Sequence, residues 1–282
     1  MVFDGVLPEK EISGWRAADG EEFPTPNTHE IVVFVSFFYR GFGVPTSDFF
    51  CGLLTFYGIE LVHLNPNSIL HIATFIHFCE AFLGIRPHFA LFRSLFLLKP
   101  CPSASQITVA GGAGFQLRPG KSSLYLGLKL ATSLKGWHKR WFYIANPAPS
   151  LPSYRGLRPL VRDCWNSSPS PREMGQVNDL LEMIEVKKRQ GVSGLGVVTN
   201  FIYRRVNPIK ERVHPAYEFT GLGDPTRESD ARWELDALSD RLRSLFASDV
   251  VLDMTGHPKP YSLDHPADEV IFFALLFAFI FF

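Results

Sequence analysis

Residues 23–98 read FPTPNTHEIVVFVSFFYRGFGVPTSDFFCGLLTFYGIELVHLNPNSILHIATFIHFCEAFLGIRPHFALFRSLFLL, and this stretch decides the fold. It is a series of apolar runs that Gly and Pro interrupt at near-regular intervals. Such a pattern is typical of short helices that begin at proline and end at glycine. The stretch therefore predicts a compact helical core, and it contains no recognisable catalytic constellation.

Four helices are expected in this stretch, over residues 27–41, 46–58, 65–84 and 87–96. The β-branched residues of the first segment leave a strand possible there. The third helix opens with Asn65-Pro66, a cap followed by proline at the first helical position. Because its run from Ile69 to Leu83 is apolar almost all round, we expect it to be the central buried helix.

The hydrophobic pattern of the sequence changes after Pro100, where short, alternating, aromatic-rich runs replace the long apolar ones. These runs predict a small antiparallel sheet with strands at 115–117, 124–130 and 141–144. Further helices are expected at 174–189, 192–206 and 225–245. The predicted fold class is α+β, mainly α, with an N-terminal helical core, a small central antiparallel β-sheet and C-terminal helices.

Composition divides the chain into five parts. Residues 1–22 are polar and read as a disordered lead-in, and residues 146–172 have the Pro and Ser content of a linker or long surface loop. The expected division is 1–22, 23–145 for the core with its sheet, 146–172, 173–247 for the C-terminal helical region, and 248–282 for an irregular segment with an apolar tail.

Charge and cysteine content limit the classes of function. Among the 282 residues, 28 Lys and Arg balance 28 Asp and Glu, so the chain is not built globally to coat nucleic acid or an anionic membrane. The four cysteines show no C-x-x-C pair and fit a reducing compartment. We expect an intracellular protein, cytoplasmic or nuclear and not secreted, because the N-terminus lacks the pattern of a signal peptide.

The run 270–282 is apolar without a polar break, but it is shorter than the about 20 residues of a membrane helix. A tail anchor stays possible, whereas an end that packs on the core, or one that is not native, is favoured. Membrane association is accordingly not expected.

Several motifs resemble functional sites without meeting their requirements. Gly114 and the Gly120-Lys121 pair enclose five residues, whereas a P-loop needs four, so no nucleotide cofactor is expected. His71 and His77 would point to different faces of a helix, and His77 and Cys79 are two residues apart and do not face each other, so no metal site is expected. Signatures of hydrolases are absent from the sequence. We expect no catalytic residues, no cofactor and no small-molecule substrate.

A basic and aromatic segment is the best candidate for binding. Such a composition can hold phosphates and stack bases, although a strand with a solvated basic face and a packed aromatic face has the same composition and is favoured. A second, basic run is also a candidate for binding nucleic acid, and there too a structural role is favoured. The candidate nucleic-acid-binding residues are Lys135, His138, Lys139, Arg140 and Trp141, with Arg204 and Arg205 from the second run.

Several longer sequence segments resemble those of a known family. CEAFLGIRP at 79–87 and the GW-x-x-RWF element at 136–142 are distinctive, and they lie in order with FPTPNTHEIVVFVSFFYRGFGVP and VNPIKERVHPAYEFTGLGDPTR. Across residues 21–227 the chain resembles the gypsy-type transposon domain of grass genomes. The resemblance implies a protein derived from a plant long-terminal-repeat retrotransposon, on its gag-like side rather than its polymerase side.

Two departures from the family suggest a truncated or decayed copy without activity: the loop 146–171 is short, and the tail after residue 268 has no counterpart. The favoured hypothesis is a non-enzymatic structural or interaction protein that associates with itself and binds RNA weakly. The alternative is a nucleotide- or DNA-processing enzyme of a mobile element that uses Lys121 and Asp253.

Overall fold

The computed structural model describes residues 14–44, 46–128, 130, 135–148 and 150–202, with the separate residues 7, 10, 206, 240 and 243–245. Within them the architecture is α+β and mainly helical, as predicted. The expected helix at 225–245 and the tail 270–282 lie largely or wholly outside the described residues.

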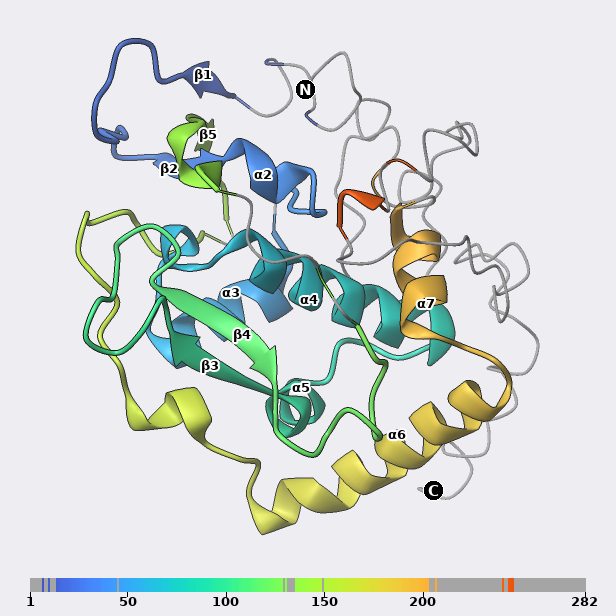
Figure 1. Ribbon diagram of the computed structural model, residues 1–282. Helices are drawn as coiled ribbons and strands as arrows, with labels where there is room; N and C mark the ends of the chain where they lie inside the picture. The colour runs from blue at the N-terminus through green and yellow to red at the C-terminus, as the bar shows by residue number, and fades with distance from the viewer. Residues whose placement is uncertain are drawn as a thin grey trace.

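The predicted central helix is confirmed as α4, Pro66–His77, which Figure 1 shows in the middle of the molecule. The Asn65 side chain caps its first turn by accepting a hydrogen bond of 2.9 Å from the Ser68 amide. Beyond His77 the chain continues as one π-helical turn, Phe78–Phe82. Ten of the twelve α4 residues are buried, as an all-round apolar sequence requires.

Two neighbouring helices also follow their sequence signals. Helix α3, Asp48–Tyr57, begins at a Ser47 cap and ends at Gly58, whose φ of 64° is the left-handed conformation that favours glycine. Helix α5, Phe89–Leu95, starts after His88, two residues later than Pro87 suggested. Phe96 belongs to the following strand instead of this helix, so the prediction of a helix through residue 96 was wrong at its end.

The predicted first helix is wrong over most of its length. Residues Glu30–Phe34 form strand β2, and only Val35–Phe38 form a helix, α2. Ile31, Val32 and Val33 are β-branched and fit an extended chain. All three are buried, and an apolar run buried on both faces cannot be assigned to helix or strand by its periodicity.

The strands form two sheets instead of the single sheet that we predicted. Strand β5, Trp141–Ala145, lies between β1, Arg16–Ala17, and β2, and both pairings are antiparallel. Strands β3, Phe96–Pro100, and β4, Ala113–Leu117, form a separate antiparallel pair in which Leu98 lies opposite Phe115.

Of the predicted strand 124–130, the described residues 124–128 form no strand. The Lys121 carbonyl accepts hydrogen bonds from the amides of Leu124 and Tyr125, which makes a turn there. Tyr125 and Leu126 then bury their side chains in the core, so their apolar character reflects packing and not strand pairing.

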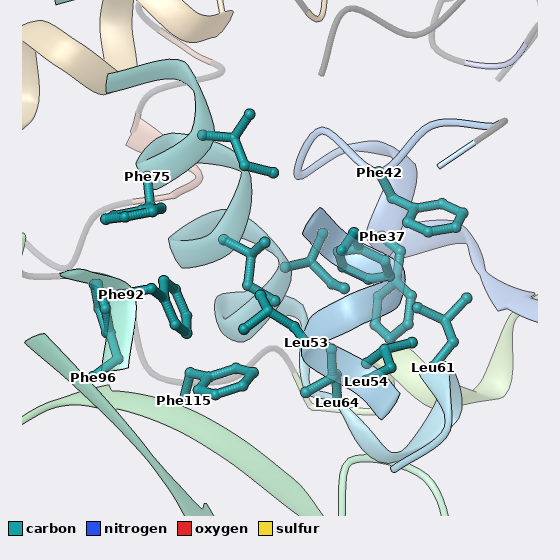
Figure 2. Close-up of a cluster of buried hydrophobic side chains, with 14 of the residues drawn as sticks. Phe37, Phe42, Leu53, Leu54, Leu61, Leu64, Phe75, Phe92, Phe96 and Phe115 are labelled. Atoms are coloured by element: carbon teal, nitrogen blue, oxygen red, sulfur yellow. The ribbon is translucent and has the colours of Figure 1, made fainter. Parts of the chain in front are cut away.

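Aromatic side chains from both halves of the stretch 23–98 fill the core, as Figure 2 shows. Phe92 is fully buried, with ring centroids 4.8 Å from Phe96, 5.1 Å from Phe75 and 5.1 Å from Phe115. These edge and stacked contacts join α4, α5 and both strands of the β3–β4 pair. These rings form an aromatic cluster inside a hydrophobic core that also contains many aliphatic side chains.

The Pro- and Ser-rich segment 150–170 packs on this core. Trp165, in the short 3-10 helix Asp163–Asn166, is buried and donates a 3.0 Å hydrogen bond to the Tyr57 carbonyl. Arg155 forms a 2.7 Å ion pair with the buried Glu60. The segment leads into α6, Pro171–Arg189, whose Ser170 and Glu173 form a capping box, and then into α7, Gly194–Phe201. Both of these helices were predicted from the sequence.

Candidate nucleic-acid interface

The basic candidate residues lie together on the turn that enters β5. Gly136 takes a φ of 72°, and a single 3-10 turn, Trp137–Lys139, follows it. The Lys139 amide donates to the Gly136 carbonyl at 3.0 Å, and the Arg140 carbonyl accepts from the Val35 amide at 3.0 Å. The turn is thus fixed to the sheet at its carboxyl end.

Four cationic or titratable side chains on this turn are exposed: Lys135, His138, Lys139 and Arg140. No acidic residue occurs between positions 135 and 145. Within the described part of the chain, no ion pair involves Lys135, Lys139 or Arg140. Because nearby carboxylates do not neutralise them, these cations are available to an anionic partner.

The aromatic residues of the same segment face the core instead of the solvent. Trp137 stacks on Phe37 with centroids 5.7 Å apart and meets Phe34 edge-on at 4.8 Å. Its ring also covers Gly111, where an added Cβ would lie 2.7 Å from Trp137 Cζ2. Trp141 is half-buried against the core. Base stacking on these two rings therefore requires faces that protein atoms largely cover.

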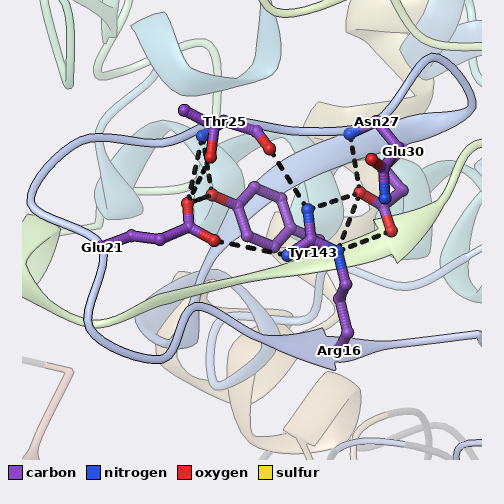
Figure 3. A network of polar contacts seen from close by, with 6 residues as sticks. All are labelled: Arg16, Glu21, Thr25, Asn27, Glu30 and Tyr143. Carbon is purple, nitrogen blue, oxygen red and sulfur yellow. Dashed lines mark hydrogen bonds and ion pairs between the residues drawn. The ribbon is translucent and has the colours of Figure 1, made fainter.

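Tyr143 is likewise occupied, by the polar network that Figure 3 shows. The guanidinium of Arg16 lies over its ring, 3.8 Å from the centroid, and pairs with Glu30 at 2.8 Å. The tyrosine hydroxyl accepts from the Thr25 amide and donates to Glu21. The network attaches the N-terminal segment to β5, and its polar groups already have partners within the protein.

The geometry of the turn thus presents charge without exposed aromatic faces. Such a surface suits contact with phosphate groups, which carries no sequence information, better than recognition of bases. The other two candidates, Arg204 and Arg205, lie outside the described residues. The structure therefore brings together only the candidates between positions 135 and 141.

The histidines of α4 contact other elements of the fold. His77 Nε2 forms a 2.6 Å hydrogen bond with Asn200 Oδ1 of α7, and so joins two helices. His71 lies 5.4 Å from the Phe96 ring, and its Nδ1 is enclosed. Within the described residues, no group of three or more His, Cys, Asp or Glu side chains could hold a metal ion.

We expect His71 to make stability depend on pH. Burial lowers the pKa of His71 to about 4, from its ordinary value of 6.5. Because the folded-state pKa is the lower one, the unfolded chain takes up the proton first as the pH falls. The stabilising contribution of the neutral, buried His71 to the free energy of unfolding is therefore fully present above pH 6.5, and it is lost progressively as the pH falls toward 4. Urea unfolding of His71→Phe should show a shallower decline over this range, whereas His138→Phe, at an exposed position, should decline like the wild type.

Sequence reasoning missed the arginines that hold the segment 150–170 in place. Arg118 donates to the Arg93 carbonyl at 2.8 Å, to Asn166 Oδ1 at 2.9 Å and to the Ser167 carbonyl at 2.8 Å. Arg93 in turn donates to the Ser168 carbonyl at 2.9 Å. No local signal marks these residues, since their partners are distant in sequence.

The turn Gly120-Lys121 shows no phosphate-binding loop. Gly114 lies inside β4, packed against Asn65 and Cys101, and the chain after Lys121 turns without starting a helix. A P-loop needs a helix N-terminus at this point. Asp253, the other residue of the enzymatic alternative, lies outside the described residues.

Comparison with known proteins gives one match. A family model described as "Putative gypsy type transposon" matches residues 31–100, the stretch from β2 through β3. No curated protein and no solved structure matches the chain significantly. The resemblance to a gypsy-type transposon family is confirmed for the helical core, and the basic turn lies outside the match. No helix among the described residues has the length and apolar character needed to cross a membrane.

Proposed function

We propose that this chain is a non-enzymatic structural or interaction protein of a long-terminal-repeat retrotransposon, of the gag-like kind. It associates with itself and contacts RNA phosphates through Lys135, His138, Lys139 and Arg140. The similarity of residues 31–100 to a gypsy-type transposon family supports the origin. The unneutralised cations at the entry to β5 are the observation that carries the RNA contact.

The form of the interface determines what kind of RNA binding follows. Three permanent charges on one fixed turn attract a polyanion, while the core occupies the neighbouring aromatic rings. Binding of this type is weak, sensitive to salt and tolerant of sequence. A protein that packages or coats RNA needs these properties, whereas a protein that selects one site needs contacts to bases.

We expect the triple variant Lys135→Ala, Lys139→Ala, Arg140→Ala to bind single-stranded RNA at least about tenfold more weakly at low salt. Each phosphate contact with a single strand contributes about 0.7 to the slope of log affinity against log salt concentration, so the slope should fall by about 2. Fluorescence anisotropy with a labelled RNA of mixed sequence, at several salt concentrations, measures both quantities.

The matched control removes three exposed cations elsewhere: Arg86→Ala, Lys99→Ala, Arg172→Ala. It changes the net charge equally, so a similar loss of affinity in both variants would mean that only overall charge matters. A wild-type protein whose binding to RNA does not depend on salt would contradict the proposed contact outright.

A further inference from the structure

Exposed apolar side chains are concentrated in one short segment before α6. Leu157 is 60% exposed, Leu160 is 70% exposed and Val161 is 48% exposed. They alternate with arginines in the sequence RGLRPLVR, residues 155–162, which we call the arginine-leucine strap. Isolated exposed apolar residues are ordinary, but three of them within five residues mark a contact surface.

Hydrogen bonds to the core anchor the backbone of the strap. The Arg155 amide and guanidinium both donate to Glu60, and His63 Nε2 donates to the Leu157 carbonyl at 2.9 Å. Pro159 is buried against Gly112. These contacts fix the backbone of the strap while Leu160 and Val161 face solvent. Because the strap is already ordered, binding a partner loses little conformational entropy in it.

A second surface on the same chain has the complementary character. The connection between β1 and β2 carries the sequence DGEEF, residues 19–23, which we call the acidic loop. Phe23 is 71% exposed, and Asp19 and Glu22 are exposed beside it. Glu21 is engaged with Tyr143 and Arg16, which secures the loop to the sheet.

The two surfaces match in both charge and apolar content. Arg158 on the strap and Asp19 and Glu22 on the acidic loop form no ion pair within the described part of the chain. Phe23 has a large exposed apolar ring, and the exposed leucines of the strap form an apolar surface on which that ring can pack. A guanidinium beside that surface favours a partner with carboxylates beside its aromatic ring.

We propose that the acidic loop of one copy docks on the arginine-leucine strap of a second copy, with Phe23 against Leu157 and Leu160 and with Glu22 beside Arg158. The β1–β2 connection and the segment that precedes α6 lie on the same flank of the molecule in Figure 1. Two copies related by a two-fold axis can therefore form the contact twice and close a dimer. This inference rests on the self-association in the proposed function and specifies its surface.

The test is sedimentation velocity of the full chain over a range of about 1 to 100 μM. The wild type should dimerise, and Glu22→Arg or Arg158→Glu should each raise the dissociation constant at least about tenfold, because each places like charges together. Leu160→Ser should weaken the dimer similarly. All three positions are exposed, so folding should be unchanged, and circular dichroism verifies this.

An equimolar mixture of Glu22→Arg and Arg158→Glu should dimerise again, since each contact between unlike copies then joins opposite charges. Glu182→Arg, at an exposed position on α6, is the control and should dimerise like the wild type. If the wild type dimerises and the reversals do not weaken it, the surface is wrong although self-association stands. If the wild type stays monomeric, both claims fail, while RNA binding by the basic turn is judged separately.

Discussion

Phe92→Ala should lower the free energy of unfolding by about 3–5 kcal/mol, the largest effect that we expect of any single substitution. The Phe92 side chain is fully buried and contacts four aromatic rings, those of Phe49, Phe75, Phe96 and Phe115. Truncation removes these contacts and leaves a cavity where α4, α5 and the β3–β4 pair meet. Domains of this kind have only about 5–15 kcal/mol in total, so the variant should be close to unfolding.

Urea unfolding followed by tryptophan fluorescence measures this loss. Phe23→Ala makes the same chemical change at a position that is 71% exposed, and it should shift the free energy by less than about 0.5 kcal/mol. Both proteins are compared at a concentration where the wild type is monomeric. A loss below about 1 kcal/mol for Phe92→Ala would show that the aromatic cluster is not the centre of the fold.

Arg118→Ala should cost about 2–3 kcal/mol, because the carbonyls of Arg93, Phe96 and Ser167 and the Asn166 side chain lose a charged donor together. The guanidinium joins α5, β3 and the segment before α6. Its removal should therefore release that segment. Trypsin cleavage after Arg162 should accelerate before the core unfolds.

Arg118→Lys distinguishes geometry from charge. A lysine ammonium is compact and cannot reach carbonyls on several elements at once, so it should recover less than half of the loss. Arg172→Ala, an exposed arginine in the first turn of α6, is the matched control and should leave both stability and cleavage unchanged. Equal stability of Arg118→Lys and the wild type would contradict a role based on the shape of the guanidinium.

The parts of the fold that sequence predicted are those whose signals are local. Ser47 and Gly58 mark both ends of α3, and Asn65-Pro66 marks the start of α4, because caps depend on residues within one turn. The segment 30–34 could not be assigned in this way. Its strand pairing is with β5, which lies more than a hundred residues further along the chain.

Tertiary anchors were beyond sequence reasoning for the same reason. Nothing in the sequence around Glu60 indicates that Arg155 forms an ion pair with it. In the same way, nothing around Arg118 indicates that its guanidinium donates to Asn166 in the segment before α6. The Pro and Ser content of residues 146–172 predicts irregular backbone, although Pro171 and Arg172 begin α6 and residues 163–166 form a 3-10 helix. It carries no information on whether that backbone packs on the core.

The candidate interface was predictable in composition and not in orientation. The spacing of Lys135, Lys139 and Arg140 placed cations on one short segment, and the structure exposes all three. The role of Trp137 depended on Phe37, which is distant in sequence, and its ring turned inward. This separation of charge from rings is why we expect RNA to be held by its phosphates.

Cross-linking tests the central claim most directly. RNA that contains a photoreactive uridine is irradiated with the wild-type protein, and the cross-linked peptides are mapped by mass spectrometry. We predict cross-links concentrated on the peptide that contains residues 135–140, which salt reduces and the triple alanine variant abolishes. Cross-links that lie elsewhere and persist in that variant would contradict a function based on the basic turn.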